Sequence, residues 1–153
     1  MRRFFATLFL LGWAAGAFAS DTAAGRVIKV LPLFLDSRGR DAVSPSLYDR
    51  DAYQFYLRAH TNEISAMRFD VLWKASNAGE AKLKLRLELR SVSTNSLPRQ
   101  TLLEQPVAAG YFSRWTALTL AGPDYKIFGE LVAWHATLWS DDHLLAEQKS
   151  FLW

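Results

Sequence analysis

A strict alternation of leucine with charged residues runs from position 83 to position 90. The leucines stand at 83, 85, 87 and 89, and they alternate with Lys84, Arg86, Glu88 and Arg90. Successive side chains of a β-strand point to opposite faces, so this pattern predicts a strand with one buried face and one solvated face. The chain must therefore supply a second apolar layer that covers the leucines.

A second alternating segment precedes the leucine strand. Phe69, Val71 and Trp73 alternate with polar residues between positions 67 and 74, and the turn residues of 76–79 follow. A short turn between two alternating segments favours an antiparallel pair. We therefore expect these two strands to be neighbours in one sheet.

Five further segments have strand character. The segment 131–139 is strongly β-like, with Val132, Trp134, Ala136 and Leu138 expected on its inward face. The others are predicted at 27–35, where Pro32 marks an edge strand or a bend, at 101–107, weakened by Pro106, at 115–120, and at 144–153, where the chain stops on its last strand. The total is about seven strands.

One amphipathic helix is predicted after position 44. Either Ser44 before Pro45, or Ser46 with Asp49 three residues later, is a typical N-cap. Helical spacing gives an apolar face of Tyr48, Ala52, Phe55, Tyr56 and Ala59, and a solvated face of Asp49, Arg50, Gln54 and Arg58. We expect the helix to end near His60.

These elements predict a mainly β fold, an antiparallel immunoglobulin-like β-sandwich of about seven strands with one inserted amphipathic helix. A parallel α/β sheet would need helices between most strands, and the pattern indicates one. The predicted domain spans residues 27–153 and follows a mobile leader at 20–26. The sequence has no Cys, so apolar packing and not disulfides must stabilise this domain.

Residues 1–19 have the organisation of a secretory signal peptide. Arg2 and Arg3 precede an apolar run that ends in Ala17-Phe18-Ala19, a typical cleavage site. The alternative is a transmembrane anchor, but the small residues in the second half of the run favour cleavage. We therefore predict a periplasmic or secreted protein with no membrane span after cleavage. Loss of the two arginines lowers the net charge from +3 to +1, which gives no charge-based case for a nucleic-acid partner.

No catalytic, cofactor-binding or metal-binding residue is predicted. His60, His135 and His143 lack the spacing that brings ligands to one face of an element. The sequence also lacks a Gly-x-Ser-x-Gly elbow and a Gly-rich phosphate loop. A Ser-His-Asp arrangement assembled from distant positions stays an open alternative.

Aromatic residues near the C-terminus form the candidate interaction surface. His135 and Trp139 alternate to the face opposite the inward residues of their strand, and Phe151 and Trp153 are expected on the neighbouring strand. If exposed, these four side chains would form a surface of the kind that stacks on sugars or docks a protein. The alternative that we favour is that the early helix covers this face with its apolar side.

One segment resembles the corner of immunoglobulin-like and fibronectin-like sandwiches. The segment from Leu118 to Tyr125 precedes the strand around Trp134. In those folds a tyrosine near the entry to a late strand bonds back to the backbone. The resemblance implies that Tyr125 is the structural corner residue. Tyr125 precedes the strand by more residues than the usual corner has, and we expect residues 126–129 to form a helical turn in this gap.

The chain is also similar to a group of small exported bacterial proteins of unknown function. The similar segments are Ser44-Pro45-Ser46-Leu47, Arg50-Asp51-Ala52-Tyr53-Gln54, Arg68-Phe69-Asp70-Val71 with Trp73-Lys74, and Glu147-Gln148-Lys149-Ser150-Phe151-Leu152-Trp153. This resemblance implies no activity, because none is assigned to the group.

The sequence therefore predicts a non-catalytic exported module with a binding or structural role in the bacterial envelope. The expected partner is another envelope protein or a glycan, and no cofactor is expected. The alternatives are a carbohydrate-binding module that uses exposed aromatics and a hydrolase with an unrecognised site. The ligand and the oligomeric state do not follow from the sequence.

Overall fold

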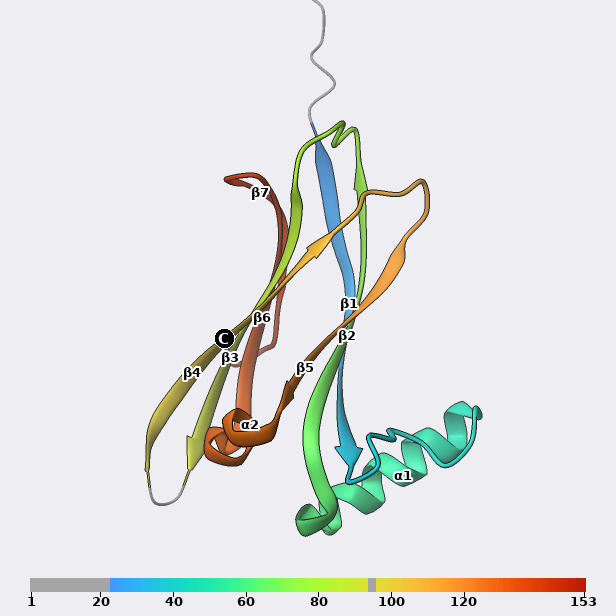
Figure 1. Ribbon diagram of the computed structural model, residues 1–153, viewed down its shortest axis with the longest axis vertical. Coiled ribbons are helices and arrows are strands. Elements are labelled where there is room, and N and C mark those ends of the chain that lie inside the picture. Colours follow the sequence, from blue (N-terminus) through green and yellow to red (C-terminus); the bar gives the residue numbers. More distant parts are fainter. Residues whose placement is uncertain (1–22, 94–95) are drawn as a thin grey trace, which may run out of the picture.

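The computed structural model describes residues 23–93 and 96–153, and it shows a two-layer β-sandwich (Figure 1). The elements are β1 (Ala24–Asp36), α1 (Leu47–Ala59), a 3-10 turn η1 (Thr61–Glu63), β2 (Ile64–Ser76), β3 (Leu83–Ser93), β4 (Ser96–Val107), β5 (Arg114–Ala121), α2 (Gly122–Phe128), β6 (Glu130–Ser140) and β7 (His143–Lys149). The predicted signal peptide and the first residues of the predicted leader lie outside the described residues. Strand β1 begins earlier than the strand predicted at 27–35.

The seven strands form two antiparallel sheets, and this confirms the predicted fold class. One sheet has the order β1-β2-β5 and the other has the order β4-β3-β6-β7. A constant-type immunoglobulin sandwich pairs its fourth strand with the sheet of the first, second and fifth strands. Here β4 pairs with β3 in the opposite sheet. None of the helices in the described part of the chain is long and apolar enough to cross a membrane.

Two of the edge strands contain proline. Strand β1 contains Pro32 and lies at an edge of its sheet, as predicted, while β4 contains Pro98 and Pro106 and lies at an edge of the other sheet. Proline has no N–H to donate to a neighbouring strand, so it is tolerated at such edges.

The core lies between the sheets and is built from the alternating residues of β2 and β3. Phe69, Val71 and Trp73 of β2 and Leu85, Leu87 and Leu89 of β3 are all buried in one cluster. Burial of each such side chain stabilises the fold by about 1.5–3 kcal/mol. The indole N–H of Trp73 donates to the Thr116 hydroxyl at 2.8 Å, so its polar atom is satisfied inside the core.

The predicted pairing of β2 with β3 is wrong. Strand β2 pairs with β1 and β5, whereas β3 pairs with β4 and β6. The loop between them crosses from one sheet to the other, with Asn77 and Gly79 in the left-handed conformation. The physical reason is that the apolar faces of β2 and β3 must face each other across the core, and neighbours in one sheet cannot do this.

Two predictions near the C-terminus are also wrong. The pairing of β6 with β3 shifts register near Arg90, so Val132 is 37 % exposed while its neighbour Leu131 packs against the core. The bulge exchanges the inside and outside positions of residues 131 and 132 only. Trp134 packs against the core and Ala136 and Leu138 are buried in it, as predicted. The last strand ends at Lys149, and the final residues form a turn and not a strand.

Helix α1 begins where the sequence predicted, but its orientation was predicted wrongly. Ser46 is the N-cap, and its side chain accepts from the backbone N–H of Asp49. The buried residues of the helix are Gln54 and Leu57, while Tyr48 is 81 % and Phe55 is 74 % exposed. Gln54 was expected to face water, and it is 3 % exposed.

Candidate functional site

The structure places three of the four predicted surface residues on the outer face of the four-stranded sheet, and two of them, His135 and Trp153, are in contact. The His135 imidazole lies 2.8 Å from a Glu147 carboxylate oxygen, and its ring centre is 5.1 Å from that of Trp153. Trp139 lies on the same strand face as His135 and donates its indole N–H to Thr137 at 2.8 Å. Phe151 is fully exposed in the terminal turn.

Arginine side chains cover the two tryptophans of this surface. The guanidinium carbon of Arg90 lies 3.8 Å from the Trp153 ring centre, and that of Arg86 lies 5.4 Å from the Trp139 ring centre. Both indoles are therefore half-buried under cations. One face of each ring is therefore already occupied by a cation and is not free to stack on a ligand.

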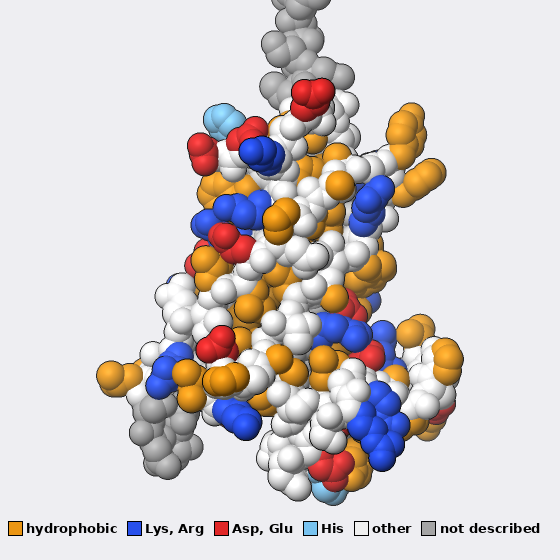
Figure 2. Space-filling model, in the orientation of Figure 1, with side chains coloured by type: hydrophobic (Ala, Val, Ile, Leu, Met, Phe, Trp, Pro, Cys, Tyr) orange, Lys and Arg blue, Asp and Glu red, His pale blue; other side chains and the backbone are white. Residues whose placement is uncertain are grey.

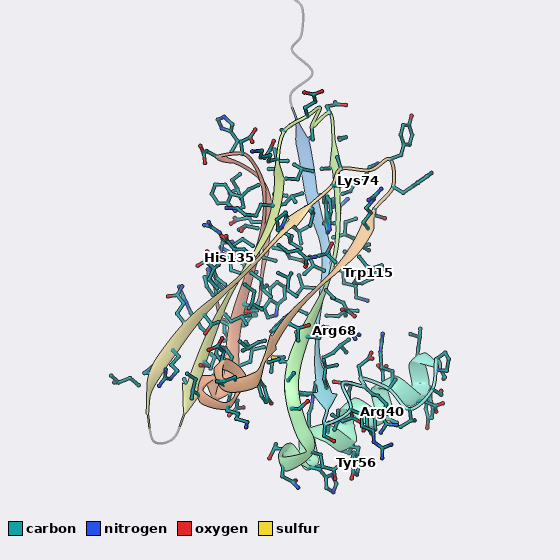
Figure 3. All side chains as sticks on the ribbon, viewed as in Figure 1. Arg40, Tyr56, Arg68, Lys74, Trp115 and His135 are labelled. Carbon is teal, nitrogen blue, oxygen red and sulfur yellow. The ribbon has the colours of Figure 1, made fainter. Side chains whose placement is uncertain are left out.

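The expectation that the helix covers this surface is wrong. Figure 3 shows His135 on the four-stranded sheet, while Tyr56 marks α1, and Arg40 the turn before α1, at the lower end of the other sheet. The cause is the anchoring of α1 to β1, because Gln54 bonds to the end of that strand and not to the sheet that carries His135.

Tyr125 lies in α2, which connects β5 to β6, so the sequence placed it in the correct connection. Its ring packs against the core, and burial raises the pKa of its hydroxyl. Within residues 23–93 and 96–153 its hydroxyl has no hydrogen-bond partner, and the corner hydrogen bond predicted for it is not formed there. The nearby Ser91 hydroxyl instead donates to the carbonyl of Phe128 and fixes the end of α2.

A cleft of about 680 Å³ opens at the end of the sandwich where α1 and α2 lie. Its apolar wall comes from both sheets and consists of Pro32, Leu33, Phe34, Ile64, Met67 and Leu131. In Figure 1 the two sheets diverge at this end, with α2 between them and α1 projecting beside β1 and β2. Because β7 pairs only with residues 135–140 of β6, it does not close the first part of that strand.

A few polar groups also line the cleft. Arg58 and Thr61 come from α1 and η1, and Tyr125 and Glu130 come from the α2 and β6 side. Mostly apolar walls with a small number of polar groups are typical of sites for small molecules, and this volume lies in their usual range of about 300–1,000 Å³. We call this space the end cleft.

The side-chain amide of Gln54 fixes the position of α1 beside the end cleft. Its oxygen accepts from the backbone N–H of Phe34 at 2.8 Å, and its nitrogen donates to the carbonyls of Phe34 and Asp41, each at 2.9 Å. The amide thus takes the place of a neighbouring strand at the free edge of β1. The helix is held to the strand edge by backbone-like hydrogen bonds and not by apolar packing alone.

A second anchor of α1 is the buried carboxylate of Asp36. It accepts hydrogen bonds from the backbone N–H groups of Arg38 and Arg40, from the Arg40 guanidinium and from the Tyr53 hydroxyl, at 2.8–2.9 Å. Burial alone would raise the pKa of Asp36, but these hydrogen bonds outweigh it and hold that pKa well below its usual range. The hydrogen bond to Asp36 raises the pKa of Tyr53 in turn.

Sequence reasoning missed the end cleft and both anchors. The edge character of Pro32 was visible in the sequence, and Asp36 and Arg40 were interpreted only as turn residues. Gln54 on a helix otherwise rich in aromatics could have indicated a bond to a strand edge. The cleft itself had no local signal, because it depends on where two sheets diverge.

Hydrophobic side chains are also exposed away from the cleft. Figure 2 shows them at the outer end of α1 and on the loop that joins β4 to β5. In that loop Tyr111 and Phe112 are almost fully exposed, with ring centres 6.0 Å apart in an edge-on arrangement, and Trp115 follows on β5, half exposed.

In the part of the chain that the structure describes, no group of three or more acidic or histidine side chains is placed to hold a metal ion. Comparisons of the chain with protein-family models, curated proteins and solved structures found no match.

Proposed function

We propose that this chain is an exported, non-catalytic binding module of the bacterial envelope and that the end cleft binds a small apolar molecule. The observation that carries the proposal is the cleft itself, about 680 Å³ in volume with apolar walls from both sheets. Export is inferred from the pattern of residues 1–19.

The rigid surroundings of the cleft support a binding role. Leu33 and Met67 in its wall belong to the buried core, and the Gln54 and Asp36 anchors hold α1 at its rim. A preformed site loses less conformational entropy when a ligand binds. An apolar ligand would also remove the exposed parts of Phe34 and Leu131 from water.

The test is titration of the secreted chain with the apolar fluorophore 1-N-phenylnaphthylamine. We expect a saturable rise in fluorescence, and at least a tenfold weaker affinity in Leu131→Trp, because the larger ring fills the cleft. Leu97→Trp is the matched control, since Leu97 is exposed on β4 away from the cleft, and its affinity should equal that of the wild type. Thermal unfolding of each variant verifies that it is folded. The proposal fails if the wild type gives no saturation, or if a folded Leu131→Trp binds as well as the wild type.

Carbohydrate binding is the second candidate, and the exposure of Tyr111, Phe112 and Trp115 favours it. These aromatics are more open than Trp139 and Trp153, so they are the rings to test. Retardation of the wild type, but not of Trp115→Ala, in native gels that contain envelope polysaccharide would favour this candidate. Equal mobility of both in all gels would contradict it. The hydrolase alternative stays a prediction, to be tested by a broad hydrolase screen of the secreted chain.

A further inference from the structure

We propose that the ligand of the end cleft is an amphiphile with an anionic head group, a carboxylate or a phosphate, and that Arg58 binds this head. The inference rests on the proposed function, because it names the ligand class of the same cleft. The tail would lie along Phe34, Ile64 and Leu131.

Arg58 differs from other arginines near α1 in what it contacts. Arg40 pairs with Asp36 at 2.8 Å, Arg50 with Asp51 at 3.5 Å, and Arg68 with Asp41 and Asp70 at 3.0 and 2.9 Å. Arg58 has no carboxylate partner among the described residues, and its guanidinium carbon lies 6.0 Å from the ring centre of Phe34. Its charge is therefore available at the apolar wall of the cleft.

The helix explains why Arg58 lacks an acidic partner. The positions three and four residues away on either side hold Gln54, Phe55, Thr61 and Asn62, none of which carries a charge. Arg58 lies in the last turn of α1, where a cation complements the helix dipole. The two anchors fix α1 against β1, and this places Arg58 at the rim of the cleft.

The other polar groups of the cleft define one orientation for the ligand. Thr61 lies in η1, directly after α1, and also lines the cleft. Its hydroxyl can donate to an anionic oxygen. Glu130 lines the β6 side and would repel an anion there. The head group should therefore lie toward α1, with the tail directed between the sheets.

A guanidinium binds carboxylate and phosphate oxygens through charge-assisted, often paired hydrogen bonds. Both head groups therefore suit Arg58, and the experiment has to separate them. It uses displacement of 1-N-phenylnaphthylamine from the secreted chain by dodecanoate, dodecyl phosphate, dodecanol and dodecyltrimethylammonium, each below its micelle concentration. These four probes share a tail and differ in the head.

We expect the two anions to bind at least tenfold more tightly than dodecanol, and the cation to bind most weakly. The ratio of the two anions identifies the preferred head group. In Arg58→Gln the anions should fall to the affinity of dodecanol, while dodecanol itself is unchanged. Arg58→Lys keeps a charge and should retain part of the preference. Arg38→Gln, an exposed arginine in the turn before α1, is the matched control and should behave like the wild type.

The outcomes separate this inference from the proposed function. If dodecanol binds as well as the anions, the cleft is an apolar site and the assignment of an anionic ligand is wrong. If the preference persists in a folded Arg58→Gln, another group binds the head and the assignment of Arg58 is wrong. If the fluorophore itself does not bind, the proposed function fails as well. If the fluorophore binds and none of the four probes displaces it, the assignment of an amphiphile as the ligand is wrong.

Discussion

Replacement of Gln54 by leucine tests whether the side-chain amide really holds α1 to the edge of β1. The substitution keeps the side chain close to its original size and removes three hydrogen bonds, two to the backbone of Phe34 and one to the carbonyl of Asp41. A hydrogen bond contributes about 1 kcal/mol net, and a buried group that loses its partner costs about 1–3 kcal/mol. We expect a loss of about 3 kcal/mol in the free energy of unfolding.

The assay is urea unfolding of the purified protein, followed by far-ultraviolet circular dichroism and by tryptophan fluorescence. With a slope of about 1.5 kcal/mol per molar urea, the expected loss lowers the midpoint by about 2 M. Gln100→Leu is the matched control, because Gln100 is exposed on β4 and makes a single side-chain bond of 3.3 Å to Glu88. Its unfolding free energy should change by less than about 0.5 kcal/mol.

Equal stability of the two glutamine variants would contradict the anchoring role of Gln54. If Gln54→Leu and Gln100→Leu unfold at the same urea concentration, the amide of Gln54 does not stabilise the fold and α1 is held by other contacts. If the argument is correct, Gln54→Leu should also weaken anion binding in the end cleft, because Arg58 then loses its fixed position.

Three further substitutions test other parts of the structure. Asp36→Asn should lower the stability at pH 7 and make the stability depend less on pH. The pKa of Asp36 is lower in the folded state than in the unfolded chain, so the carboxylate stabilises the fold above the unfolded pKa of about 3.9. This stabilisation is lost as the pH falls below that value. Urea midpoints between pH 2 and pH 7 measure this, and parallel curves for both proteins would contradict it. Thr116→Val leaves the buried indole N–H of Trp73 without its acceptor and should cost about 1–3 kcal/mol by urea unfolding, whereas an unchanged midpoint would mean that the bond is dispensable. Gly25→Ala would place a Cβ 2.7 Å from the Cβ of Leu145, so β1 and β7 must separate. We expect the free energy of unfolding to fall by about 1–3 kcal/mol, measured by thermal unfolding. An unaltered melting temperature would show that this contact is loose.

The strands could be predicted from the sequence because their signal is local. Leu85, Leu87 and Leu89 report a buried face through their spacing alone, and the structure confirms that face. Which strands pair is not local. The turn after β2 has the composition of a hairpin, but it crosses between the sheets because both neighbouring positions of β2 belong to β1 and β5.

The candidate site was harder to predict for a related reason. Hydrophobicity placed Phe55 inside and Gln54 outside, yet the structure reverses them, because the free edge of β1 offers an N–H and a carbonyl that only a polar side chain can satisfy. His135 and Trp139 lie on one face of β6, as strand alternation predicted, whereas Trp153 reaches His135 from the terminal turn and not from a strand. The arginines that cover the two tryptophans come from β3. A single sequence does not show that β3 is the neighbour of β6, so this contact could not be predicted.

The borders of the two sheets have a consequence for behaviour at high concentration. An unsatisfied strand border is a template on which identical chains add to one another and grow into fibres. In this protein Pro32 and the Gln54 amide block the outer border of β1, and Pro98 and Pro106 interrupt that of β4. Where many copies crowd together, these two borders offer no continuous ladder for a neighbour, so the folded molecules resist joining through β1 or through β4.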